Sequence, residues 1–182
     1  MTLKIASDLY SKPGLNAIGG ARWCFRTIEL ATTDLVSTQL VALSILPAGH
    51  RLMDAFVDTD KLDNGGTAAA ITMSVGILNT YYGEAEASAT NAAAYSSGGA
   101  TDTGTAPALV SGQNIMTSVT AAQAGGRAVA GLSGANMSLS PSNAIGVDKT
   151  KDRIVAVQFP VAPNTALAGT LSLAILIDRD QE

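Results

Sequence analysis

The chain has 182 residues, of which 47% are hydrophobic and only 14% charged, with 11 basic residues against 15 acidic ones. This length suits a single domain with its own core, and a net charge of -4 lacks the basic excess that nucleic-acid phosphates require. One cysteine and one histidine are too few for an intrachain disulfide, a thiolate zinc site or most acid–base and nucleophilic mechanisms. The counts therefore predict a protein that is not an enzyme and needs no cofactor.

No apolar run reaches the roughly 18 residues of a membrane-spanning helix, and the N-terminus lacks the apolar stretch of a secretory signal. We therefore expect synthesis in the cytoplasm and no membrane partner. Residues 1–20 mix charges, Pro13 and a Gly-Gly pair without periodicity, which indicates an arm and not an independent helix.

The first half of the chain predicts a series of strands. From Arg22 the segment WCFRTIEL is rich in aromatic and β-branched residues, and its alternation places Trp23, Phe25 and Thr27 on one face. TQLVALSIL predicts a buried strand that ends at the turn Pro47-Ala-Gly49, and HRLMDAFVDTD predicts another, with Leu52, Asp54, Phe56 and Asp58 on one face. A loop at 58–67 leads to the strand AAITMSVGIL.

Residues 85–126 are dominated by Ala, Gly, Ser and Thr, which predicts a long loop with one short helix ending at Gly125. RAVAGLSG and MSLSPSNAIG predict short edge strands, because glycine and proline interrupt them. RIVAVQFPV and GTLSLAILID predict two strong strands joined by the turn APNTALA. Short strands between turns, with almost no helical periodicity, predict one all-β domain over 21–182, an antiparallel β-sandwich of jelly-roll-like type.

Few residues suggest chemistry. Asp58, Asp60 and Asp63 could offer oxygen ligands to calcium. The twelfth position counted from Asp58 is Ala69 and not the glutamate of an EF-hand, so a solvated hairpin end is the preferred interpretation and no metal is predicted.

Other side chains of the sequence suggest contacts and not catalysis. His50 follows a turn and is interpreted as a turn or interface residue. Tyr81, Tyr82 and Tyr95 are interpreted as anchors to the sheet or to a partner, with stacking on a sugar as the alternative. Cys24, between two aromatic residues, is expected to be a small buried or half-buried apolar residue and not a reactive thiol.

The stretch LVALSILPAGHRLMDAFVDTDKLDNGGTAAAITMSVGIL resembles a recurrent element of tailed-bacteriophage virion proteins. QAGGRAVA, SLSPSNAIG and DRIVAVQFPVAPNTALAGTLSLAILI resemble the second half of the same proteins, the head decoration or cement proteins. The resemblance covers about residues 35–178. It implies a β-sandwich, often a trimer, on the outer face of the major capsid protein lattice, and it supplies no catalytic residue.

On this interpretation the protein is a homotrimeric virion component that decorates and stabilises a phage head. Residues 1–20 and 85–126 would bridge neighbouring capsid subunits through many weak contacts that gain by multivalency. The alternative is a tail or head-fibre module that adheres to host-surface glycans.

Overall fold

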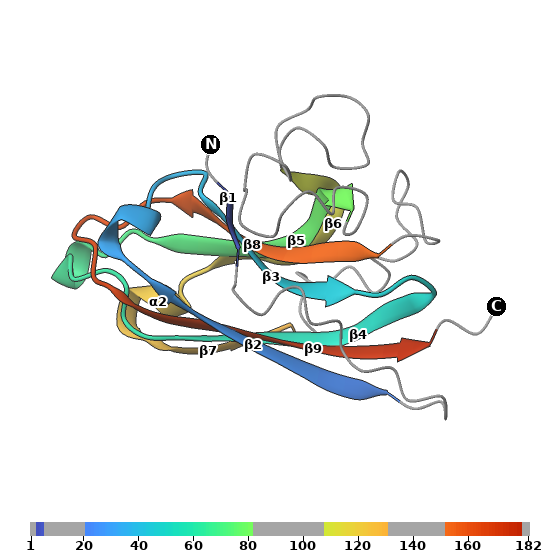
Figure 1. The fold of residues 1–182 in the computed structure, drawn as a ribbon. Coiled ribbons are helices and arrows are strands. Elements are labelled where there is room, and N and C mark those ends of the chain that lie inside the picture. Colours follow the sequence, from blue (N-terminus) through green and yellow to red (C-terminus); the bar gives the residue numbers. More distant parts are fainter. Residues whose placement is uncertain (1–2, 6–20, 82–107, 131–151, 180–182) are drawn as a thin grey trace.

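The computed structural model describes residues 3–5, 21–81, 108–130 and 152–179, which form a sandwich of two β-sheets (Figure 1). The strands are β1 (Leu3–Ile5), β2 (Arg22–Leu30), β3 (Leu40–Leu46), β4 (His50–Thr59), β5 (Thr72–Tyr81), β6 (Leu109–Val119), β7 (Gly126–Val129), β8 (Arg153–Val161) and β9 (Gly169–Arg179). The helices of these ranges are short: η1 (Thr32–Asp34), η2 (Gly66–Ala68) and α2 (Ala121–Ala124). None of them has the length or apolar character to cross a bilayer. The predicted all-β sandwich is confirmed.

The upper layer in Figure 1 is a five-stranded sheet in the order β1-β3-β8-β5-β6, and the lower layer is a four-stranded sheet in the order β2-β9-β4-β7. The strand pairs of the two sheets are antiparallel, apart from β1, which pairs with β3 in parallel. The jelly-roll-like connectivity stays a prediction, because three of the connections pass through residues outside the described ranges.

The structure differs from the sequence prediction in the segment 85–126. Its second half contains β6, which pairs with β5, because Ile115 and Met116 bury their side chains in the core. The predicted short helix is present as α2 and ends at Gly125, whose φ of +80° suits a residue without a side chain. A Cβ at Gly125 would lie 3.0 Å from the backbone nitrogen of Lys61. β7 lies at a sheet edge as predicted, whereas MSLSPSNAIG lies outside the described residues.

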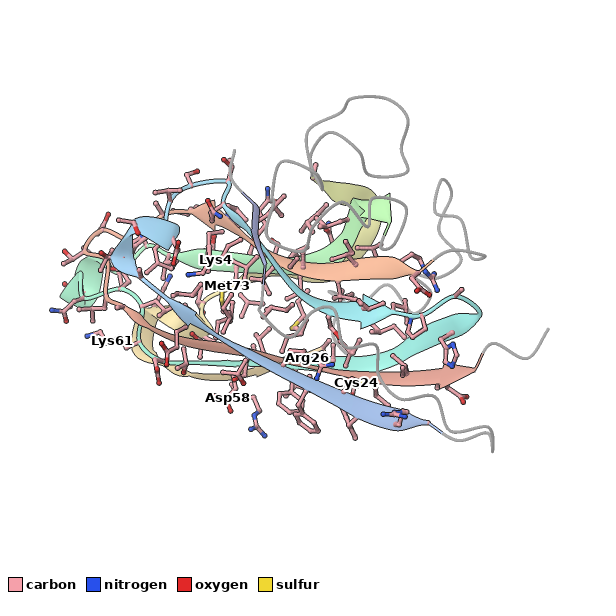
Figure 2. All side chains as sticks on the ribbon, in the orientation of Figure 1. Lys4, Cys24, Arg26, Asp58, Lys61 and Met73 are labelled. Carbon is pink, nitrogen blue, oxygen red and sulfur yellow. The ribbon has the colours of Figure 1, made fainter. Side chains whose placement is uncertain are left out.

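Both faces of the five-stranded sheet are apolar. Its inner face packs against the lower sheet in the main core, and Figure 2 shows Met73 between the two layers. Strand β3 is buried at every position, as its sequence predicts, because it also contributes to a second cluster on the other face. That cluster consists of Leu40, Ala42, Ile45, Leu78, Ile154 and Ala156.

A β-bulge in β4 decides which of its side chains point outward. The register with β9 shifts between Leu52 and Asp54, so the extra residue, Met53, reverses the alternation. Leu52 is therefore buried, while Asp54, Phe56 and Asp58 occupy the outer face. The prediction that Leu52 shares a face with these three residues is wrong for this reason.

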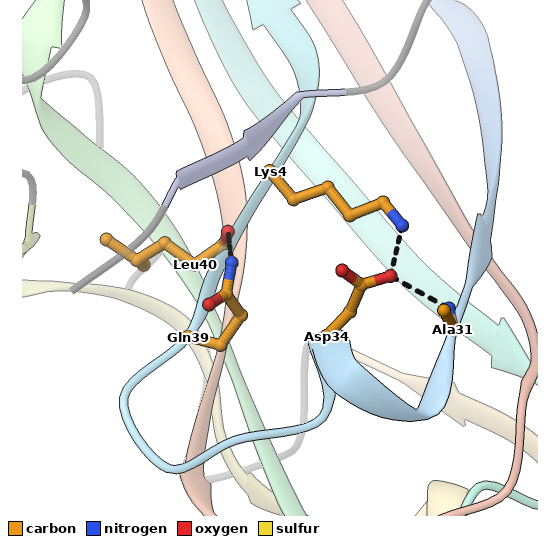
Figure 3. A network of polar contacts seen from close by, with 5 residues as sticks. All are labelled: Lys4, Ala31, Asp34, Gln39 and Leu40. Atoms are coloured by element: carbon orange, nitrogen blue, oxygen red, sulfur yellow. Dashed lines mark hydrogen bonds and ion pairs between the residues drawn. The ribbon is translucent and has the colours of Figure 1, made fainter. Parts of the chain in front are cut away.

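A polar contact ties the N-terminal strand to the body of the sandwich. Lys4 of β1 forms an ion pair with Asp34 of η1, and the same carboxylate oxygen accepts a hydrogen bond of 2.8 Å from the backbone N–H of Ala31 (Figure 3). Close by, the amide of Gln39 donates to the carbonyl oxygen of Leu40. The predicted N-terminal arm thus begins with a strand, and residues 6–20 lie outside the described ranges.

Candidate interaction surface

The outer face of the four-stranded sheet carries aromatic side chains that the core does not use. Alternation along β2 places Trp23 and Phe25 on one face, as the sequence predicts, and the structure turns that face outward while Cys24 is buried. Trp23 is 39% exposed and Phe25 is 60% exposed. Large apolar side chains gathered on a surface usually mark a place where another molecule binds.

The register of the sheet brings Phe56 to these two residues. Phe25, Ala174 and Phe56 lie opposite one another across β2, β9 and β4, and Val129 of β7 continues the row. The ring centroid of Phe56 is 5.4 Å from that of Trp23 and 5.9 Å from that of Phe25. Tilted and edge-on contacts at these distances are favourable aromatic pairs, so the three rings form one cluster.

Arg127 of β7 completes this surface. Its guanidinium lies 4.4 Å from the ring centroid of Phe56, a cation–π distance. It also donates to Asp58 at 2.8 Å from Nη2 and at 3.3 Å from Nε, and Figure 2 shows Asp58 on the side of the lower sheet that faces away from the upper one. We call the surface formed by Trp23, Phe25, Phe56, Arg127 and Val129 the aromatic face.

A hollow adjoins the aromatic face at β7. It has a volume of about 360 Å³ and is lined by residues 116–121 together with Arg127, Ala128 and Val129. Arg127 and Val129 thus border both the hollow and the aromatic face. A side chain from a partner that packs against Val129 would have room beside it.

The three calcium candidates each have protein partners. Asp58 pairs with Arg127 on the aromatic face. Asp60 accepts two hydrogen bonds of 2.8 Å from Thr170, one from its backbone N–H and one from its hydroxyl, and these bonds lower the pKa of the Asp60 carboxyl. Among the described residues, no group of three or more acidic, histidine or cysteine side chains could hold a metal ion.

Asp63 organises the loops at one end of the sandwich. Its buried carboxylate accepts five backbone hydrogen bonds of 2.8 to 3.2 Å, from Gly65, Ala70, Ile71, Asn164 and Thr165. Burial acts to raise the pKa of the Asp63 carboxyl, but the N–H donors outweigh it and hold the pKa well below its usual range. The carboxylate thus joins the loop after β4 to the loop after β8.

We expect calcium to leave the thermal stability of the protein unchanged, because the oxygens of Asp60 and Asp63 already accept hydrogen bonds from the protein. The measurement compares unfolding midpoints in millimolar calcium and in excess chelator. A midpoint that rises with calcium concentration would contradict this expectation, since a ligand that binds the folded state stabilises it by mass action.

The predicted contact residues are only partly described. His50 begins β4, and its Nδ1 lies 2.9 Å from the carbonyl oxygen of Ala48 in the turn. Its own carbonyl oxygen accepts a 2.6 Å hydrogen bond from the buried Arg153, which stands opposite Tyr81 in the register of β8 and β5. The backbones of His50 and Tyr81 therefore both lie near Arg153. Tyr82 and Tyr95 lie outside the described residues, and a partner contact at any of these positions stays a prediction.

Cys24 is a buried, free cysteine, 5% exposed, as the sequence predicts. Burial raises the pKa of its thiol, against the opposing effect of the neighbouring Arg22. Because thiolate and access are both required for reaction, we expect Cys24 to react with a disulfide reagent at least about 100-fold more slowly in the native protein than in denaturant. An added surface cysteine, Val161→Cys, serves as the fast-reacting control. Equal rates for the two thiols in the native state would contradict the prediction.

The aromatic face was not predicted as a site. The alternation of β2 predicts that Trp23 and Phe25 share a face, but a strand pattern alone does not say which face is exposed. The sequence does carry one signal that this face is exposed. Thr27 and Glu29, which are polar, continue the alternation of Trp23 and Phe25 and therefore lie on the same face. The place of Phe56 depends on the bulge at Met53, for which the sequence carries no equivalent signal.

Comparison with known proteins gives similarity in structure only. No protein-family model matches the chain, and no curated protein matches it in sequence. A chain in the capsid of Ralstonia phage GP4 has a similar structure, with a TM-score of 0.67 and 21% identity over 99% of this chain and 99% of that one. A chain of the cyanophage Pam1 capsid asymmetric unit aligns with a TM-score of 0.45 and 14% identity, over 92% of this chain and 91% of that one. This protein thus shares its fold with a chain of the GP4 capsid, and the similarity extends over nearly the whole length of both chains.

Proposed function

We propose that this protein is a structural component of a bacteriophage virion, which decorates and stabilises the capsid as a homotrimer on the outer face of the major capsid protein lattice. The full-length structural similarity to a chain of the Ralstonia phage GP4 capsid is the observation that carries the proposal. The aromatic face supports it, because a protein that works by adhering to a shell needs an exposed apolar surface.

The proposal is tested with particles from a phage that lacks this gene. The purified chain should bind these particles up to a fixed ratio of copies per capsid, and the particles without it should release their genome at a lower temperature or after milder osmotic shock. Sedimentation of the free chain should give three times the chain mass. Particles that neither bind the chain nor gain stability from it would overturn the proposal, and capture of host polysaccharide in their place would favour an adhesion module.

A further inference from the structure

We infer that the aromatic face is the surface by which this protein docks on the capsid shell, and that the shell protein presents there an apolar centre with a rim of lysine or arginine. The inference rests on the proposed function and adds to it the docking surface and the chemistry of the partner.

The aromatic face does not serve the core of the sandwich. The opposite faces of β2, β4 and β9 supply the core through residues such as Leu52, Val57 and Leu173, all of them buried. Phe25 and Val129, at the two edges of the sheet, remain 60% and 59% exposed. A chain with two of its three phenylalanines and its one tryptophan on one outer face carries the residue types that anchor protein interfaces.

The charges around these rings indicate which charge the partner's surface should carry. On the outer face Arg127 stands opposite Asp58, while the backbone register pairs Asp178 with Arg51. Glu29 and Asp54 stand opposite Thr170 and Leu176, with no basic residue across from them.

At the outward positions of β2, β4, β7 and β9 the acidic side chains thus outnumber the basic ones, which favours a partner with a basic rim. If a second copy of this chain docked here face to face, its Glu29 and Asp54 would approach the Glu29 and Asp54 of the first copy. Each copy also carries a net charge of -4, so the two copies would repel one another. Like charges placed together in this way disfavour contact between two aromatic faces.

The geometry of the rings favours a protein partner over a sugar. Stacking on a sugar needs a free ring face, whereas Arg127 covers a face of Phe56, and Trp23 tilts against both phenylalanines. The hollow beside Val129 provides room for a protruding side chain of the shell protein. A cluster of anchors beside a hollow, with charges at the rim, is the common arrangement of a protein interface.

Trp23 gives a direct test, because it is the single tryptophan of the chain. When the wild-type protein binds particles that lack it, emission from Trp23 should move to shorter wavelength and become less accessible to a soluble quencher. Variants Phe25→Asp and Val129→Asp, on opposite edges of the face, should each bind at least about 30-fold more weakly. Val36→Asp and Val161→Asp, at exposed valines away from the face, are matched controls that should bind within about twofold of wild type, as expected for positions outside an interface.

The rim is tested by charge neutralisation. Glu29→Gln with Asp54→Asn should weaken binding by roughly tenfold at low salt and by much less at high salt, because screening removes the effect of exposed charges. Ser37→Lys with Thr67→Lys raises the net charge by the same two units at exposed positions elsewhere, and should leave binding unchanged. Equal effects of both pairs would overturn the assignment of a basic rim.

The outcomes separate this inference from the proposed function. If the wild type saturates the particles while Phe25→Asp and Val129→Asp bind equally well, the aromatic face is not the docking surface, although the proposed function stands. If the wild type does not bind particles at all, the proposed function fails. Self-association or polysaccharide binding that Phe25→Asp abolishes would assign the face to a second copy or to a glycan and overturn the inference. Circular dichroism verifies that each variant is folded, and the Trp23 signal of the wild type needs no variant.

Discussion

Replacing Asp63 by asparagine should lower the free energy of unfolding by about 3 kcal/mol, the scale of several charge-assisted hydrogen bonds lost inside a protein. The asparagine amide keeps one acceptor oxygen but turns an NH2 group toward backbone N–H donors that now contact both carboxylate oxygens. For a chain of this length the thermal midpoint should fall by about 10 °C. Chemical and thermal unfolding followed by circular dichroism measure both quantities.

Asp60→Asn is the matched control for this change. Asp60 is exposed, and within the described ranges its carboxylate accepts hydrogen bonds from a single residue, Thr170, so its replacement should destabilise the protein far less. Equal losses at the two positions would show that the loops do not depend on the buried carboxylate.

The contribution of Asp63 should also depend on pH. The pKa of this carboxyl is lower in the folded protein than in the unfolded chain, so its charged form stabilises folding. The stabilisation is present in full above the unfolded pKa, roughly 4, and is lost as the pH falls below that value toward the folded pKa. The difference in stability between wild type and Asp63→Asn should therefore be constant near neutral pH and shrink in acid. A difference that stays constant in acid would contradict the shifted pKa.

Phe159→Ala should lower the free energy of unfolding by about 4 kcal/mol, through lost burial and the cavity left behind. The side chain of Phe159 is completely buried in the main core. Its backbone is hydrogen-bonded to the residues just before β3: its N–H donates to the carbonyl oxygen of Gln39 at 3.1 Å, and its carbonyl oxygen accepts from the N–H of Thr38 at 2.8 Å. The site has little freedom to collapse, because the neighbouring β3 is buried at every position. Urea unfolding of the variant measures the loss.

Phe25→Ala removes the same side chain from the aromatic face and should change stability by less than about 1 kcal/mol, as most surface substitutions do. The pair of variants separates the two uses of phenylalanine in this chain. Phe159→Ala should lower the stability of the protein without a separate effect on its affinity for particles, whereas Phe25→Ala should lower the affinity alone. A large loss of stability in Phe25→Ala would show that the aromatic face has a structural role.

Local patterns in the sequence were sufficient for most of the strands. Alternation predicts the β2 face that holds Trp23 and Phe25, and the apolar runs predict β3, β8 and β9 at their observed places. The turn at Pro47-Ala-Gly49 and the end of α2 at Gly125 follow from backbone preferences of a few residues. Each of these features depends on neighbours along the chain, which a sequence displays directly.

The candidate site depends on pairings between distant residues, and these were decided by the tertiary structure. Phe56 joins Trp23 because both strands pair with β9 and because the bulge at Met53 turns Phe56 outward. In the sequence Asp63 is one of several aspartates in a loop. Its role depends on the loop after β8, which supplies two of its five N–H donors. Similarly, the sequence predicts a loop at β6 because Ala, Gly, Ser and Thr dominate residues 85–126, whereas pairing with β5 makes this segment a strand. A shift of one residue in register reverses every outward side chain beyond it, so the exposed face of this sheet follows from long-range packing and not from local propensity.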